Sequence, residues 1–199
     1  MPTSPSGPDL TRSTGNLIGT LPRGRSRVKI RATDEVTSPL PAADLFELLA
    51  DPRGCITWHE HPSVARPASI EAPDGPALRG ATYTSRGMIG KIECLTTTTV
   101  TAAERPRFYE TSSHTTFGHP RAPALDSKER FVLEDRPSGS LVRYETNITR
   151  DFSSLDILSR GYMELLNLIN AGRAERGLRK CFRDVLAAAE REVQRRRAQ

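Results

Sequence analysis

The sequence has few cysteines and no long apolar run. Its three cysteines, Cys55, Cys94 and Cys181, are widely spaced among 199 residues and form no CxxC pair. This pattern argues against a disulfide framework or a zinc site and favours a reducing compartment. The chain lacks a run of about 18 apolar residues that would span a membrane, and no apolar secretory segment opens it. We therefore expect a cytoplasmic protein without a transmembrane segment.

Acidic residues are fewer than basic ones, 24 against 29, which gives a formal net charge of +5 and a pI of about 9.4. Such a balance invites a nucleic-acid interpretation, but the excess lies at the two ends. Residues 1–31 hold six basic residues against one acidic, and residues 173–199 hold nine against four, so the body 32–172 carries −5. We expect no specific nucleic-acid surface on the folded domain. The basic ends leave open docking to an acidic partner such as RNA or an anionic membrane.

The chain divides into a tail and one domain. Residues 1–26 are rich in Pro, Gly, Ser, Thr and Arg, which predicts a disordered basic tail followed by a single domain over 27–195. Alternation of apolar residues predicts a strand over 28–36, and helical spacing predicts a helix over Ala42–Leu49, with a second short helix near Ile56. Six further strands, separated by turn signals and by a loop at 118–127, are expected at 64–71, 80–89, 91–103, 107–117, 128–135 and 140–150.

The end of the chain has a helical period. A helical stretch over 153–172 is interrupted or kinked at Ala171-Gly172, and a long amphipathic helix over 174–195 follows. Short connections between successive strands predict an antiparallel sheet with one face to bury, and the last helix has one face to offer. The predicted fold is therefore α+β, a curved antiparallel sheet wrapped around a long C-terminal helix.

The order of elements and several short motifs resemble the START-like, or SRPBCC, superfamily of helix-grip proteins, in its polyketide cyclase/dehydrase and lipid-transport branch. The motifs are Ser38-Pro39 before the first helix, Asp51-Pro52-Arg53 with Trp58, Gly80 before Tyr83, Glu104 to Phe108, and Gly139 to Tyr144. The resemblance implies a hydrophobic pocket between sheet and helix. Family members bind lipids, sterols, polyketides or aromatic hormones, and some catalyse cyclisation or dehydration there.

The cluster Trp58-His59-Glu60-His61 is the most suggestive of chemistry. Its spacing is poor for a metal and no third ligand lies nearby, so we expect no metal site and no cofactor. Trp58 is interpreted as a cavity wall or a core aromatic, and His61 as a residue near the cavity entrance.

A second candidate set lies on the strands. His114 and Glu110 share one face of their strand, and Tyr144 shares the apolar face of its own strand with Val142. If the face of His114 points inward, these three side chains are candidates for general acid–base catalysis of ring closure or dehydration. If it points outward, His114 and Glu110 are ordinary solvent-facing residues.

The pocket that the resemblance implies would be lined by residues from both layers. The expected ligand-binding residues are Trp58, His61, Tyr83, Cys94, Tyr144, Met163, Leu166 and Phe182. The favoured hypothesis is a binding protein for a small hydrophobic molecule. The alternatives are a cyclase, dehydratase or isomerase of natural-product type and an interaction module that docks through its basic ends.

Overall fold

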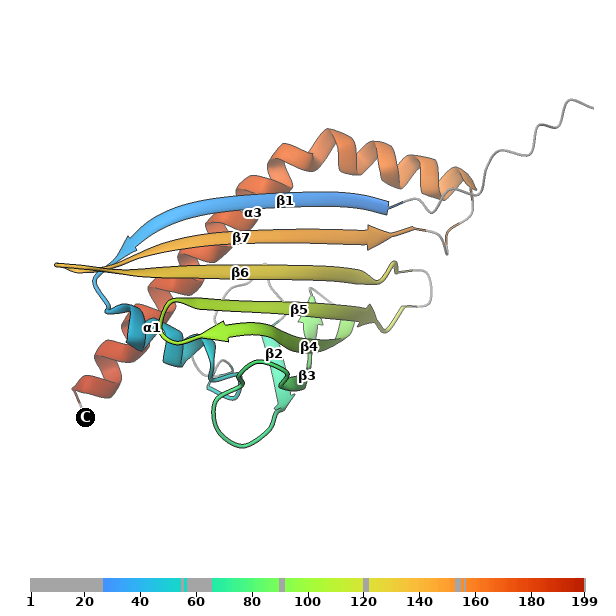
Figure 1. Cartoon of the computed structure of the whole chain (residues 1–199). Coiled ribbons are helices and arrows are strands. Elements are labelled where there is room, and N and C mark those ends of the chain that lie inside the picture. Colours follow the sequence, from blue (N-terminus) through green and yellow to red (C-terminus); the bar gives the residue numbers. More distant parts are fainter. Residues whose placement is uncertain are drawn as a thin grey trace, which may run out of the picture.

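The computed structural model describes residues 27–54, 56, 66–89, 92–119, 122–152, 155 and 157–198, with the backbone alone over most of 157–171. Within these described ranges, seven strands and two helices follow one another, and Figure 1 shows their arrangement. They are β1 (Arg27–Ser38), α1 (Ala42–Leu49), β2 (Arg66–Glu71), β3 (Thr82–Ile89), β4 (Ile92–Glu104), β5 (Phe108–Phe117), β6 (Leu125–Arg136), β7 (Gly139–Asp151) and α3 (Ile157–Arg197).

The strands form one antiparallel sheet in the order β1-β7-β6-β5-β4-β3-β2. Each strand pairs with its neighbour in sequence except β1, which closes onto β7 at one edge. Figure 1 shows that the sheet is curved and that α3 crosses one of its faces to end beside α1. The predicted α+β fold, with a curved antiparallel sheet and a long C-terminal helix, is confirmed.

Two local predictions are corrected. The loop expected over 118–127 is shorter, because β6 begins at Leu125, which pairs with both Thr115 and Arg150. Of the interruption or kink expected at Ala171-Gly172, the interruption is absent, since α3 is one helix through this point; Figure 1 shows that the axis of α3 bends along its length. The predicted tail 1–26 lies outside the described residues, as does most of the predicted second helix.

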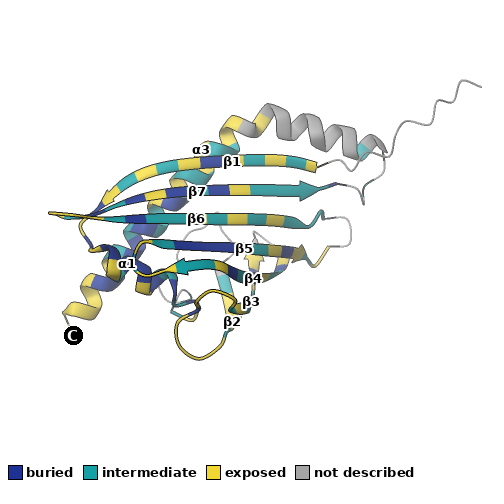
Figure 2. Ribbon diagram, viewed as in Figure 1, coloured by how far each residue is buried: buried dark blue, intermediate teal, exposed yellow. Residues whose placement is uncertain are grey.

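The hydrophobic core lies where α1 and the second half of α3 meet the sheet, as the buried residues of Figure 2 show. Phe46 of α1 is fully buried and contacts Tyr109 of β5 edge to face, with ring centroids 5.8 Å apart. The Tyr109 hydroxyl donates a hydrogen bond to the carbonyl of Ala77 at 3.0 Å. Burial raises the pKa of Tyr109, so this hydroxyl stays protonated as a donor. Aromatic packing thus fixes α1 against one end of the sheet.

The junction of β1 with α1 depends on the turn between β6 and β7. Pro41 precedes α1 and supplies no capping side chain, but the backbone N–H of Ala42 donates to Asp135 Oδ1 at 2.9 Å. Gly139 has a φ of +135°, and a Cβ at this position would lie 2.0 Å from the Ser38 carbonyl oxygen. Only glycine therefore lets the β6–β7 turn approach the end of β1 so closely.

The C-terminal arginines are engaged within the molecule. Arg196 bonds to Glu192 at 2.8 Å and lies 3.7 Å from Asp51. Arg197 pairs with Asp44 at the start of α1. These contacts link the end of α3 to α1. They also pair much of the positive charge at this end of the sequence with local carboxylates.

Candidate functional site on the helix face of the sheet

The two faces of the sheet differ in what they contact. We call the face that α1 and α3 cover the helix face and the opposite one the outer face. Tyr144 of β7 belongs to the helix face, because its ring stacks on Phe182 of α3 with centroids 4.5 Å apart. Cross-strand register places Phe131 of β6 and Tyr109 of β5 on the same face.

Hydroxyl groups line the helix face on β4 and β5. Thr98 and Ser113 hydrogen bond across the two strands at 2.9 Å, and Thr96 and Thr115 do the same at 2.9 Å. Thr111 lies on this row one step closer to the core. This part of the face is therefore polar but uncharged, and its hydroxyls offer both donors and acceptors.

A carboxyl group lies next to this row. In the sequence Lys128-Glu129-Arg130, alternation along β6 sends both cations to the outer face and Glu129 to the helix face. Lys128 and Arg130 then bind Glu110 of β5 on the outer face, at 2.9 and 2.8 Å. Glu129 is consequently separated by the sheet from the two positive charges that flank it in the sequence.

Glu129 has one hydrogen-bond partner among the described residues. The Tyr144 hydroxyl donates to Glu129 Oε1 at 3.0 Å. Burial raises the pKa of Glu129, and the Tyr144 hydrogen bond opposes this effect only in part. Burial raises the pKa of Tyr144 as well, and the nearby Glu129 adds to the shift. The pair can therefore hold protons at two adjacent oxygens, a tyrosine hydroxyl and a carboxylic acid.

Aromatic rings connect this pair to the core, of which Tyr144 and Phe182 are part. The Phe131 ring lies 5.1 Å from that of Tyr144 and 6.3 Å from that of Phe182. A small apolar cavity of about 30 Å³ lies behind these rings, between α1, α3 and the sheet. It is lined by Leu45, Leu48, Leu49, Phe131, Leu133, Val142, Phe182, Val185, Leu186 and Ala189. A space of this size holds about one water molecule, so it is a packing defect rather than a ligand site.

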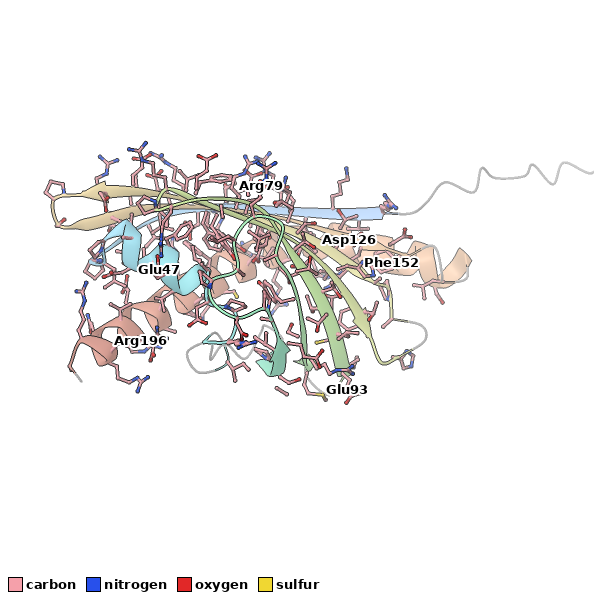
Figure 3. All side chains as sticks on the ribbon, turned by 60° about the horizontal axis from the view of Figure 1, so that its bottom comes forward. Glu47, Arg79, Glu93, Asp126, Phe152 and Arg196 are labelled. Atoms are coloured by element: carbon pink, nitrogen blue, oxygen red, sulfur yellow. The ribbon has the colours of Figure 1, made fainter. Side chains whose placement is uncertain are left out.

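A larger hollow of about 240 Å³ opens at the other end of the sheet. Its walls come from β2, β3, β4 and the end of β5. Gly87, Cys94 and Phe117 alternate to the helix face, whereas Arg86, Leu95 and Thr116 alternate to the outer face, so both faces contribute to the hollow. Figure 3 shows Glu93, another lining residue, at the end of the sheet away from Glu47 of α1. The volume is slightly below the range of about 300–1,000 Å³ typical of small-molecule sites, so a ligand there would be small.

The structure does not bring His114, Glu110 and Tyr144 together. His114 is exposed on the outer face, where its Nδ1 lies 2.7 Å from Asp126 Oδ1. Glu110 is on the same face, in the ion pairs with Lys128 and Arg130. Burial alone would raise the pKa of Glu110, but its hydrogen bonds to Lys128, Thr101 and Arg130 lower it to about 2. Both side chains are thus on the opposite side of the sheet from Tyr144.

The other expected pocket residues divide into two groups. Tyr83, Cys94, Tyr144 and Phe182 lie on the helix face or on the helix that covers it. Cys94 is buried, which raises the pKa of its thiol, and the structure records it as a free cysteine. Trp58 and His61 lie outside the described residues, and Met163 and Leu166 occupy α3 at positions whose side chains are not described.

Within the described ranges, no three His, Cys, Asp or Glu side chains gather in a way that would hold a metal ion. No described helix combines the length and the apolar character that crossing a bilayer requires. His59 and His61 of the sequence motif lie outside the described residues.

A curved antiparallel sheet that grips a long C-terminal helix defines the helix-grip class of proteins, and a partly open helix face is where such a fold has room for a small molecule. The family can be named more closely. The chain belongs to the polyketide cyclase/dehydrase and lipid transport family, whose model matches residues 29–193. No curated protein matches the sequence.

Solved structures share the fold at low sequence identity. An uncharacterised protein from Rhizobium leguminosarum matches with a TM-score of 0.60 and 13% identity, over 84% of this chain and 98% of that one. A protein from Rhizobium loti matches with a TM-score of 0.57 and 18% identity, over 82% and 99%. Ara h 8.0201 matches with a TM-score of 0.51 and 14% identity, over 81% and 98%. At these identities the likeness establishes the fold alone.

Proposed function

We propose that the protein binds a small, largely apolar molecule between the helix face of the sheet and α3. The observation that carries this proposal is the incomplete packing of that face. Tyr83 and Phe131, which point toward the helix layer, are only partly buried, and Cys94 of the same face is among the residues of both faces that line the 240 Å³ hollow. Large side chains left partly open on the inner face of a domain are the usual wall of a ligand site.

The family supports the same proposal. Its description combines lipid transport with polyketide cyclase and dehydrase activity, and these roles all require a site for a mainly apolar compound. The hydroxyl row formed by Thr96, Thr98, Ser113 and Thr115 supplies the few polar groups that would orient such a compound.

Native mass spectrometry of the purified full chain tests this proposal. We expect an adduct of a few hundred daltons that is lost on denaturation and appears in the organic extract. A matched pair of variants locates the site: Cys94→Met extends a side chain toward the hollow and should weaken binding, whereas Cys94→Ala enlarges the hollow and should not. A chain that carries no adduct and binds no apolar fluorophore would overturn the proposal.

A second candidate function is a cyclase or dehydratase acting at the same place. The hydrogen-bonded pair of Tyr144 and Glu129 favours it. In the loss of water from a β-hydroxy ketone, the carboxylic acid would protonate the leaving hydroxyl, and the resulting carboxylate, stabilised by the Tyr144 hydrogen bond, would take the α-proton and so regain its own. Incubation of the protein with such a compound should then produce a species lighter by one water. Glu129→Gln should abolish that product and leave binding intact, whereas a product formed equally by the variant would exclude this role for Glu129.

A further inference from the structure

Glu129 is the one acidic side chain that reaches the helix face without a cation among the described residues. Asp34 of β1 faces the same way but pairs with Arg183 of α3 at 2.7 Å. Lys128 and Arg130, which flank Glu129 in the sequence, form their ion pairs with Glu110 of the neighbouring strand on the outer face. A carboxylate left unpaired in a desolvated place is costly, and the usual response is to keep its proton.

The described groups that face Glu129 from the two neighbouring strands carry no charge. On β7 they are the Tyr144 hydroxyl, whose hydrogen bond offsets part of the effect of burial on the pKa of Glu129, and Thr146, its direct cross-strand neighbour. On β5 the direct cross-strand neighbour is Thr111. Among the described side chains of α3, Cys181 interacts with Glu129, and burial raises the pKa of its thiol to about 12. The thiol is therefore neutral at pH 7, and the Asp34–Arg183 pair nearby is internally balanced.

The hydrogen bond from Tyr144 determines which oxygen of a protonated Glu129 can donate its proton. Tyr144 occupies Glu129 Oε1 as donor, so a protonated Glu129 has its own O–H to donate from the other oxygen. The structure shows no hydrogen bond between this oxygen and a described residue, and the buried hydroxyl of Thr146, the direct cross-strand neighbour of Glu129, has no partner either. Hydrogen bonds in such a chain polarise one another, which makes the terminal O–H a stronger donor.

We infer that Glu129, held by Tyr144, is the specificity-determining donor of the site, and that it selects neutral ligands with a carbonyl or hydroxyl oxygen over carboxylate anions. This inference rests on the proposed function. In this arrangement an acceptor oxygen of the ligand takes the O–H of Glu129 and extends the hydrogen-bonded chain that begins at Tyr144. An anionic ligand could accept the same hydrogen bond, but no described cation pairs with Glu129 to compensate for the hydration that the anion would lose.

Three matched probes test the selection: 2-acetylnaphthalene carries a neutral acceptor, 2-ethylnaphthalene carries none, and 2-naphthoate carries an anion. Calorimetric titration of the full chain at pH 7 should show the ketone binding about tenfold more tightly than the hydrocarbon, the value of one good hydrogen bond. Naphthoate should bind more weakly than both.

Variants at position 129 separate hydrogen bonding from packing. Glu129→Gln keeps an N–H donor and cannot ionise, so it should retain the ketone preference and lose any pH dependence. Glu129→Leu removes the donor and should abolish the preference while hydrocarbon binding remains. In the unaltered protein the ketone preference should fall as the pH rises through the titration of Glu129, which carboxyl ¹³C NMR follows directly.

The failures of the two proposals can be told apart. Equal binding of ketone and hydrocarbon, or a Glu129 that titrates at its ordinary value, would overturn the selection by Glu129 and leave the binding function standing. If none of the three probes binds and no native adduct is found, the binding function fails, and the selection fails with it.

Discussion

The structure assigns Glu110 a structural role on the outer face, and this can be measured. Its side chain is 8% exposed and binds Lys128 and Arg130, whose side chains are 49% and 47% exposed. These hydrogen bonds, with that of Thr101, outweigh desolvation and lower the pKa of Glu110 from 4.5 to about 2. A shift of this size corresponds to at most about 3 kcal/mol of native-state stabilisation. Screening at the half-exposed partners reduces the expected value to about 1–2 kcal/mol.

The sign of the pH dependence follows from the direction of the shift. Because the pKa of Glu110 is lowered on folding, its stabilisation is complete above the unfolded value near 4.5 and is lost as the pH falls toward about 2. Glu110→Gln should therefore reduce the free energy of unfolding in urea by about 1–2 kcal/mol at pH 7. The difference from the unaltered protein should shrink steadily below pH 4.5.

Glu134→Gln is the matched control, since Glu134 is 39% exposed and pairs with arginines on the same face. Its effect should stay below about 1 kcal/mol. A loss for Glu110→Gln that is equal at pH 7 and pH 3 would refute the electrostatic argument. A change in the affinity of 2-acetylnaphthalene would refute the placement of Glu110 away from the site.

Three further substitutions have definite expected outcomes. Gly139→Ala would drive its Cβ into the Ser38 carbonyl and should cost more than about 2 kcal/mol in urea unfolding; an unchanged midpoint would contradict the close approach. Gly172→Ala lies in α3 with no atom within 4 Å of the new methyl group, so it should raise stability by about 0.5–1 kcal/mol, and a loss would show an unseen contact. His114→Ala removes only the exposed pair with Asp126 and should leave probe affinity unchanged, with a stability change below about 1 kcal/mol.

The sheet was predictable because its strands have clear ends. Turn residues such as Pro137-Ser138 separate runs of β-branched and aromatic residues, and short connections leave only an antiparallel arrangement. The start of β6 at Leu125 was missed because the preceding segment is rich in proline, which obscures where pairing begins. Whether α3 continues through Gly172 stayed open because local propensity penalises glycine, whereas a long helix tolerates an exposed glycine at a modest cost.

The site was harder to predict because one strand is ambiguous. In β5 both faces carry hydroxyl and aromatic residues, with Phe108 on the face of His114 and Tyr109 on the other. Alternation alone therefore cannot say which face is covered; the edge-to-face contact of Tyr109 with Phe46 of α1 decides it. The candidate acids His114 and Glu110 were on the side that faces away from the helices.

A usable signal for Glu129 is present in the sequence. Glu129 shares its face of β6 with Phe131 and Leu133, whereas Lys128 and Arg130 share the other. A carboxyl group in register with two apolar residues is a candidate for burial without a cation. What the sequence cannot supply is its partner, because Tyr144 comes from the next strand and meets Glu129 only through the register of β6 with β7.

The central claim, that a small apolar molecule lies between the helix face and α3, is tested most directly on the four consecutive threonines of β4. Thr96 and Thr98 belong to the helix face, where they bond to Thr115 and Ser113, while Thr97 and Thr99 alternate to the outer face. In methyl NMR spectra of the threonine-labelled full chain, added 2-acetylnaphthalene should shift the signals of Thr96 and Thr98 and leave those of Thr97 and Thr99 unchanged. Shifts confined to Thr97 and Thr99, or no shift at saturating probe, would contradict the account.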